Sequence, residues 1–455
     1  MVVFGKPTSV PYTCYELGHT WTPSCTKASL GVCLDVFKEA VKIYGSLYLI
    51  AGIAKKRGKK YFKQKWLAET SQSTLFLTTN GTLFMAFFCL WRKILGRLYL
   101  PSLSFIPAAC ASFVGILVER ASRRGLLAVY MANVATETFY RMAVSRGWVR
   151  FLPNGEVLIF SVVMAIYLYL YKRNSLPAST VKLFRFLVGK DELPASVLEE
   201  EPMVQNRLSA TPGPADENES KMTAVKSVLT WLQNQTKHNL CKHHHSCAYY
   251  VLKGFTKMFG LGFLIQGGIK VVSVLPRLIK HPNALMQAVK HRDNFRLAAF
   301  LGCFNAVFRA VNCCLRYARN SDSDLHGLLA GFLAGWSMLW YKSITISLYT
   351  AFKLAEVLYF KGIEKKLVPY IKCADIIIYA ISTAFVFHIA VVEPHNLRPA
   401  YWKFLLRVTG NKFALMNRHL IEPFVPGSAK LSPDFWPNYD ARYTDLVRPA
   451  HLIRS

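Results

Sequence analysis

The sequence predicts an all-α, polytopic membrane protein made of two homologous helical bundles of four to five helices each. Hydrophobic residues make up 52% of the 455-residue chain, and its mean hydropathy is +0.23, although 18% of the residues are charged. The hydrophobic residues gather in windows about as long as a bilayer-spanning helix needs, roughly 20 residues. The second half of the chain also resembles the first, and such internal repeats are common in membrane proteins built from paired bundles.

The internal repeat is visible in two ungapped alignments. Residues 38–55 match residues 253–270 with seven identities in 18 positions. Residues 108–140 match residues 327–359 at an offset of 219 positions, and this block repeats a glutamate within apolar sequence. Charged residues that recur inside apolar blocks argue against chance similarity between hydrophobic segments.

Ten apolar windows mark the expected helices. They fall near 37–54, 75–95, 101–118, 125–144 and 155–171 in the first half, and near 253–275, 295–316, 325–341, 343–360 and 374–392 in the second. Three of them carry charges (37–54, 125–144 and 343–360), so the number of spans per repeat is left at four or five. Four spans would make the repeats parallel, whereas five would place them in opposite orientations.

Six segments are expected along the chain. They are a Cys/His-containing N-terminal cap (1–36), membrane repeat 1 (37–190), a disordered acidic linker (191–236), a Cys/His-rich segment (237–252), membrane repeat 2 (253–412) and a polar C-terminal tail (413–455). The linker is expected to be disordered because it combines acidic residues and prolines with few aromatic residues.

The net charge of +30 arises mainly from basic residues between the apolar windows, for example at 55–60, 92–97, 120–124 and 172–173. This placement is typical of juxtamembrane residues that contact anionic lipid headgroups. No RNA-reading motif accompanies the charge, so we expect no nucleic-acid partner. The sequence also lacks a P-loop, an H-E-x-x-H motif and a nucleophile elbow, and we therefore expect neither an enzyme nor a cofactor.

A stripe of small residues predicts close helix packing. Gly327, Gly331 and Gly335 lie at intervals of four, which places them on one face of a helix, and Ala111 and Gly115 occupy the corresponding part of repeat 1. Small residues let helix backbones approach closely in a membrane. The partner helix could belong to the same chain or to a second subunit, in which case the stripe would support an oligomer.

Glu137 and Glu356 occupy equivalent repeat positions and form a candidate intramembrane polar site together with Arg141. A carboxylate at membrane depth is costly and often marks a transport pathway or an ion pair. The alternative is a charge pair on an interfacial helix, since Arg141 follows Glu137 by four residues and Lys353 precedes Glu356 by three.

Two groups of cysteine and histidine residues precede the first window of each repeat. The first group contains Cys14, His19, Cys25 and Cys33, and the second contains Cys241, His243, His244, His245 and Cys247. The candidate metal ligands among them are Cys14, His19, Cys25, Cys241, His243 and Cys247. Thiolates and imidazoles suit zinc, but neither group has the tight C-x₂₋₄-C spacing that is usual in structural sites. We therefore expect no metal here and interpret each group as a juxtamembrane Cys/His-rich cap or a lipidation site. The cysteines within apolar windows are expected to be small packing residues.

Several stretches resemble the transmembrane protein 135 family, also called peroxisomal membrane protein 52. They are residues 14–25, 78–96, 119–147, 154–158, 325–364, 377–384 and 397–407. The glycine stripe is more loosely similar to helices of the Tim17/Tim22/Tim23 translocase group. The family resemblance implies a multi-pass protein of mitochondrial and peroxisomal membranes. It also implies links to the mitochondrial fission/fusion balance, through a dynamin-related fission GTPase, and to peroxisome organisation and lipid homeostasis. It brings no catalytic residues.

Three functional hypotheses follow. The first is a non-enzymatic organelle membrane protein that promotes dynamin-dependent mitochondrial fission and supports peroxisomal and lipid homeostasis. The alternative is a transporter or lipid conduit at the interface of the two repeats, with Glu137 and Glu356 near its axis. A third class, a translocase-like assembly subunit, would depend on helix contacts at Gly331.

Overall fold

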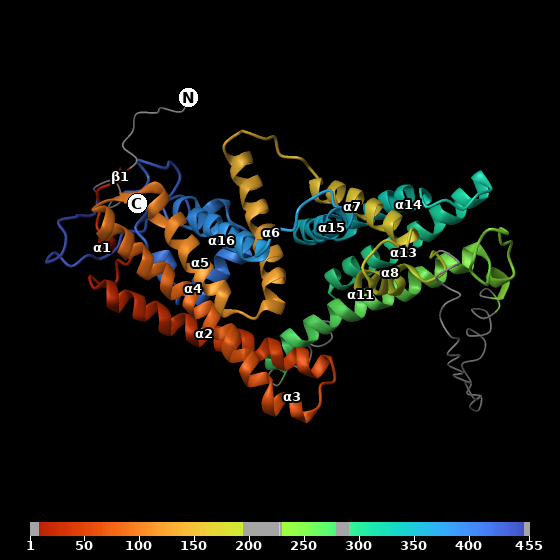
Figure 1. The fold of residues 1–455 in the computed structure, drawn as a ribbon, viewed down its shortest axis with the longest axis horizontal. Coiled ribbons are helices and arrows are strands. Elements are labelled where there is room, and N and C mark those ends of the chain that lie inside the picture. The colour runs from red at the N-terminus through yellow and green to blue at the C-terminus, as the bar shows by residue number, and fades with distance from the viewer. Residues whose placement is uncertain (1–8, 194–226, 228–229, 279–290, 450–455) are drawn as a thin grey trace. The chain divides into compact units, whose positions relative to one another are not determined.

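A computed structural model of the chain describes residues 9–193, 227, 230–278 and 291–449 (Figure 1). Most of these residues are helical, and the two strands among them, β1 (Ser9–Val10) and β2 (Leu98–Tyr99), form one short antiparallel pair. The all-α architecture predicted by the sequence is confirmed. The chain forms two compact units, unit 1 (residues 1–151 and 370–455) and unit 2 (residues 152–369).

Unit 1 is built on a hairpin of two long helices, α2 (Cys25–Ala54) and α4 (Trp66–Leu95), which pack along each other (Figure 1). The core is completed by α5 (Ile106–Val118), α6 (Ala121–Ser145) and α16 (Ala374–Val392). The remaining elements are α1 (Cys14–Leu17), α3 (Lys59–Gln64), the π-helical turn η1 (Pro101–Phe105), η3 (Pro394–Asn396), α17 (Pro399–Val408), η4 (Lys412–Leu415) and η5 (Arg418–Leu420).

Unit 2 contains a similar set of helices. Its hairpin consists of α11 (Cys247–Leu278) and α13 (Arg292–Arg319), which also pack along each other. The helices α14 (His326–Gly335), α15 (Ile344–Glu364) and α7 (Gly155–Lys172) complete its core, together with α8 (Ala178–Val188) and the 3₁₀ turn η2 (Trp336–Trp340).

The backbone repeats its unusual conformations at the offset of the sequence repeat. Asn154 and Cys373 both adopt left-handed backbone angles just before α7 and α16, and Gly147 and Lys366 do so in the preceding turns. Each of these pairs is 219 positions apart. The compact units nevertheless differ from the sequence halves, because α7 packs in unit 2 with α14 and α15, whereas α16 packs in unit 1 with α5 and α6.

The ends of the helices follow from local sequence. Ser24 caps α2 by accepting a hydrogen bond from the Lys27 backbone, and Ser343 caps α15 in the same way. The second helix of each hairpin ends at a left-handed residue, Gly96 after α4 and Asn320 after α13. Glycine and asparagine adopt this conformation most readily, so each hairpin has a sharp and well-placed end.

Five helical segments among the described residues are long and apolar enough to cross a bilayer. They are α4, η1 with α5, α7, α13 and α16. All five correspond to apolar windows expected from the sequence. The chain is therefore a multi-pass membrane protein.

The segments at the boundaries of the repeats are partly ordered. Most of the acidic linker predicted at 191–236 lies outside the described residues, but its first residues are packed, and the Glu192 side chain is fully buried. The described part of the C-terminal tail contributes Phe413, Met416 and Ile421 to the core of unit 1. The ordered bundles therefore extend beyond the boundaries expected for the linker and the tail.

Candidate functional site

Unit 2 contains a cavity of about 560 Å³ between α7, α8, α13 and α15. Its wall is mainly aromatic and aliphatic and includes Phe160, Met164, Phe184, Phe300, Phe304 and Val357. The Lys353 ammonium and the Glu356 carboxylate, 2.5 Å apart, both belong to this wall. Glu356 therefore lies beside an apolar cavity and is half-exposed.

Unit 1 contains a smaller cavity of about 130 Å³ at the corresponding place, between α2, α4, α6, α16 and α17. Its wall is also mostly apolar, and its polar groups include Asn80, which donates a hydrogen bond of 3.0 Å to the Tyr379 hydroxyl. Tyr130 of α6 and Tyr349 of α15, which are equivalent in the repeat, each line the cavity of their own unit. An apolar cavity is thus a shared feature of both units.

Glu137 has different surroundings from its repeat equivalent. Its side chain is only 3% exposed and lies between two arginines. One carboxylate oxygen accepts hydrogen bonds from Arg141 (2.8 and 3.1 Å), and the other accepts one of 2.8 Å from Nε of Arg398. Arg398 is 261 positions away in the chain, at the start of α17, and no sequence pattern links it to Glu137. The contacts describe a buried ion pair that joins α6 to α17.

The glycine stripe of α14 faces the backbone of α7 in the same chain. A Cβ atom added at Gly331 would lie 2.6 Å from the Met164 carbonyl oxygen, and one at Gly327 would lie 2.8 Å from the Leu168 carbonyl oxygen. Gly335 is equally close to Ser161. Of the two partners that the sequence left open, the intramolecular one occupies this face. In unit 1, Ala111 and Gly115 are buried in α5, where Gly115 packs against Asn80 of α4.

The structure brings the N-terminal Cys/His group together with a residue from a distant helix. We define the first cysteine cluster as Cys14, His19, Cys25 and Cys89, whose potential ligand atoms all lie within 4.8 Å of one another. Cys14 is in α1, Cys25 is the first residue of α2, and Cys89 lies near the end of α4.

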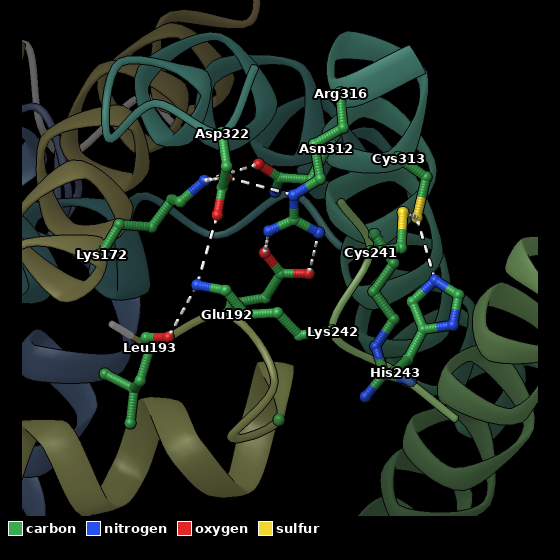
Figure 2. Close-up of polar contacts among 12 residues, drawn as sticks. Lys172, Glu192, Leu193, Cys241, Lys242, His243, Asn312, Cys313, Arg316 and Asp322 are labelled. Carbon is green, nitrogen blue, oxygen red and sulfur yellow. Dashed lines mark hydrogen bonds and ion pairs between the residues drawn. The ribbon is translucent and has the colours of Figure 1, made fainter. Parts of the chain in front are cut away.

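The second group assembles in the same way in unit 2. We define the second cysteine cluster as Cys241, His243, Cys247 and Cys313, again with ligand atoms within 4.8 Å (Figure 2). The Cys241 sulfur lies 3.9 Å from that of Cys313 and 3.8 Å from that of Cys247, and the Cys313 sulfur lies 3.6 Å from Nε2 of His243.

Both histidines are oriented by a backbone carbonyl. Nδ1 of His19 donates to the Thr22 carbonyl at 2.7 Å, and Nδ1 of His243 donates to the His245 carbonyl at 2.6 Å. A carbonyl can only accept, so Nδ1 carries the proton and Nε2 presents its lone pair to the cluster. In His19 this Nε2 is buried and has no hydrogen-bond partner in the described part of the chain.

The pKa values of the cluster groups outside the spanning helices shift in different directions, and burial raises that of Cys25. Hydrogen bonding to the Cys89 thiol lowers the pKa of Cys14 to about 5, and the positive charge of Arg92 acts in the same direction. Burial lowers the pKa of His243, so its imidazole is neutral near pH 7 and able to bind a metal. Burial raises the pKa of Cys241, whereas the positive charge of Arg316 favours its thiolate.

A buried network of ion pairs lies next to the second cysteine cluster (Figure 2). Arg316 and Glu192, which are 1% and 0% exposed, are joined by a contact of 2.6 Å. Asp322 accepts from Arg316 at 3.1 Å and from Lys172, the last residue of α7, at 3.0 Å. Lys242 lies 3.2 Å from Asp322, and it is the residue between Cys241 and His243. The network therefore positions the segment that carries two members of the cluster.

Sequence reasoning identified six of the eight cluster residues and missed Cys89 and Cys313. Both lie in apolar windows, where the sequence favoured a packing role. A signal was available in the repeat, because both cysteines lie six residues before the last residue of the second hairpin helix. Cys33, which the sequence places in the first group, belongs to α2 and is not part of the cluster.

The helices, spans and cavities define a multi-pass α-helical membrane protein with two similarly organised units. Residues 11–144 match the family model of the N-terminal cysteine-rich region of transmembrane protein 135. The match confirms, over these residues, the resemblance to the transmembrane protein 135 family that is seen in the sequence. The match gives no support to the looser likeness to the Tim17/Tim22/Tim23 group, and no solved structure matches the chain.

Proposed function

We propose that this protein is a non-enzymatic, lipid-handling protein of mitochondrial and peroxisomal membranes. It would support peroxisome organisation and lipid homeostasis and regulate the balance of mitochondrial fission and fusion. The cellular setting rests on the resemblance to the transmembrane protein 135 family, whose model matches residues 11–144. The observation that carries the lipid-binding part is the apolar cavity at corresponding places in both units.

The unit 2 cavity suits a lipid tail. Its volume of about 560 Å³ lies within the usual range of ligand pockets, roughly 300–1,000 Å³, and such pockets are mostly apolar with a few placed polar groups. The aromatic and aliphatic wall would bury an acyl chain or a sterol. Lys353 could pair with a carboxylate or phosphate of the lipid instead of with Glu356, because its ammonium is half-exposed.

The proposed role in mitochondrial fission depends on a basic surface that would bind lipid headgroups or a partner protein. The segment 55–65 connects α2 to α4 through α3 and carries seven basic residues, all exposed. Of these, Arg57 approaches the carboxylate of Glu69, at 3.9 Å. Such a surface would attract anionic headgroups or an acidic face of a dynamin-related GTPase, at about 1 kcal/mol for each basic residue near a membrane surface.

Lipid binding is tested with the purified full-length protein in nanodiscs and a fluorescent fatty acid. Thr350 lies in the cavity wall, so Thr350→Phe should fill part of the cavity and weaken binding about tenfold or more, equivalent to about 1.4 kcal/mol. Leu358→Phe is the matched control, because Leu358 is exposed on the same helix and lies outside the wall. Equal binding by wild type and Thr350→Phe, with both proteins folded, would overturn the proposal.

A lipid conduit is the second candidate, and the position of Glu356 in the cavity wall favours it. In liposomes, a conduit should move fatty acid across the bilayer and lose this flux in Glu356→Gln. A recruitment platform should instead bind the fission GTPase to proteoliposomes and lose that binding when Lys55, Lys56, Lys59 and Lys60 are changed to glutamine. Flux without GTPase binding would support the conduit, and the reverse result would support the platform.

A further inference from the structure

Both cysteine clusters have the composition of a structural metal site. Each contains three thiols and one imidazole, and their potential ligand atoms are confined within 4.8 Å. Three cysteines and one histidine are a usual donor set for tetrahedral zinc. The tight sequence spacing of classical sites is absent because the fourth ligand comes from a distant helix, Cys89 in one unit and Cys313 in the other.

The distances in the second cluster fit a single tetrahedral ion. With Zn–S bonds of about 2.3 Å and a Zn–N bond of about 2.0–2.1 Å, tetrahedral geometry requires sulfurs about 3.8 Å apart and a sulfur–nitrogen distance of about 3.5–3.6 Å. The observed sulfur–sulfur distances are 3.8 and 3.9 Å, and Cys313 lies 3.6 Å from Nε2 of His243. A disulfide would need about 2.05 Å. In a two-iron cluster, the two ligands of one iron lie farther from the two ligands of the other than the 4.8 Å within which all four ligand atoms lie here.

The histidines have the orientation that zinc ligands need. In both clusters Nδ1 donates to a backbone carbonyl, and this contact leaves Nε2 as the metal-binding nitrogen. Nε2 of His19 is an unpartnered buried atom in a residue that is 0% exposed. A buried polar atom without a partner is costly, and a metal bond would satisfy it. The second cluster is further ordered by Tyr250, whose ring stacks on His243 at 4.3 Å.

The charge around each cluster suits bound thiolates. Three thiolates and a divalent ion carry a net charge of −1, which a basic neighbour stabilises. Arg92 lines the same hollow as Cys14, Cys25 and Cys89, and Arg316 lies on α13 three residues after Cys313. Cationic neighbours of this kind favour the deprotonated thiols that zinc requires.

We propose that each unit binds one structural zinc ion, through Cys14, His19, Cys25 and Cys89 in unit 1 and through Cys241, His243, Cys247 and Cys313 in unit 2. Two ligands of each ion lie in the segment before the hairpin, and a third is the first residue of the first hairpin helix. The fourth ligand lies near the end of the second hairpin helix, so the ion joins these three parts of the unit. The ion closes the open end of the hairpin and holds the preceding segment on it. The two sites arise from equivalent positions, so a chain should bind two ions.

The direct test is the metal content of the full-length protein, purified in detergent without chelators, by inductively coupled plasma mass spectrometry. We expect two zinc ions per chain, and zinc X-ray absorption should show three sulfur ligands and one nitrogen ligand on average. A folded wild-type protein without zinc would overturn the proposal. Nitrogen and oxygen ligands alone, or iron with the visible absorption of an iron–sulfur cluster, would overturn it as well.

Variants assign the ions to the two clusters. Cys89→Ser and Cys313→Ser should each reduce the content from two zinc ions to one. Cys33→Ser and Cys303→Ser are matched controls, because these half-buried cysteines lie on hairpin helices outside the clusters. If a serine variant does not fold, His19→Cys and His243→Cys provide the second test, since they retain four ligands. These variants should keep zinc with a higher sulfur count, and an unchanged ligand set would refute the assignment.

Discussion

Replacing Gly331 with alanine tests the packing of α14 on α7. The new Cβ would lie 2.6 Å from the Met164 carbonyl oxygen and 2.9 Å from the Ala165 Cα atom. Both neighbours are backbone atoms, so no side-chain rotation can relieve the contact. The two helices would have to separate, and the small gap would remove contacts along the whole interface.

The expected change in the free energy of unfolding combines two opposing effects, overpacking and helix propensity. Overpacking of a well-packed core costs typically 1–3 kcal/mol, and contact with rigid backbone belongs at the upper end of this range. Alanine is more favourable than glycine in a helix by about 1 kcal/mol. Gly331→Ala should therefore destabilise the protein by about 2 kcal/mol. Gly260→Ala in α11 should stabilise it by about 1 kcal/mol, because no atom lies within 4 Å of its added Cβ.

Equilibrium unfolding in mixed detergent micelles measures both variants against wild type, with helical circular dichroism as the signal. The two substitutions are chemically identical, so their opposite signs isolate the effect of helix packing. Unfolding of Gly331→Ala at the same or a higher denaturant concentration than wild type would refute the proposed contact. In that case α14 would not pack on α7 through its glycine face.

Four further predictions concern charge and metal. Glu192→Gln should lower the free energy of unfolding by about 3 kcal/mol, because the buried Arg316 loses its nearest carboxylate and keeps only Asp322; unchanged stability in the same unfolding assay would contradict this. Glu137→Gln should lower the free energy of unfolding by a similar amount, because the largely buried Arg398 loses its carboxylate partner. Glu356→Gln should lower it by only about 0–1 kcal/mol, because the Lys353–Glu356 pair is half-exposed; equal losses in the two variants would contradict this contrast. Burial raises the pKa of Asp322, but the charges of Lys172 and Arg316 outweigh it and lower the pKa overall. The stability that Asp322 contributes should be present above its unfolded pKa of about 4 and lost as the pH falls below it. The difference between wild type and Asp322→Asn should therefore shrink in acid, and a difference independent of pH would count against the ion pair. Treatment with a zinc chelator should lower the unfolding temperature of wild type and have a smaller effect on Cys313→Ser; an unaffected wild type would argue against a structural ion.

Much of the fold was predictable because it depends on local sequence. Window length and hydrophobicity indicated the spanning helices, and all five candidate spans of the described residues fall in expected windows. The glycine stripe indicated a close helix contact, and in the structure this face lies against the backbone of α7. The nearby pair of Glu137 and Arg141 was also predictable, because residues four apart share one face of a helix.

The candidate sites were less predictable because their members are distant in sequence. Cys89 follows Cys25 by two helices, and in isolation it is a small residue in an apolar window. Arg398 reaches Glu137 only because α17 packs near α6 in the folded unit. Residues that are distant in sequence meet because their helices pack together, and a single sequence contains little information about which helices pack together.

The sequence alone determined that this is an all-α membrane protein, since the length and composition of an apolar segment decide whether it can satisfy its backbone within a bilayer. It also showed a resemblance to the transmembrane protein 135 family, which the family model confirms over residues 11–144. Only the tertiary structure decided that α7 packs with α14 and α16 with α5, and that Cys89 and Cys313 complete the two clusters. The physical reason is that hydrophobicity acts on each segment separately, whereas the choice of neighbours depends on shape and contacts between segments far apart in the chain.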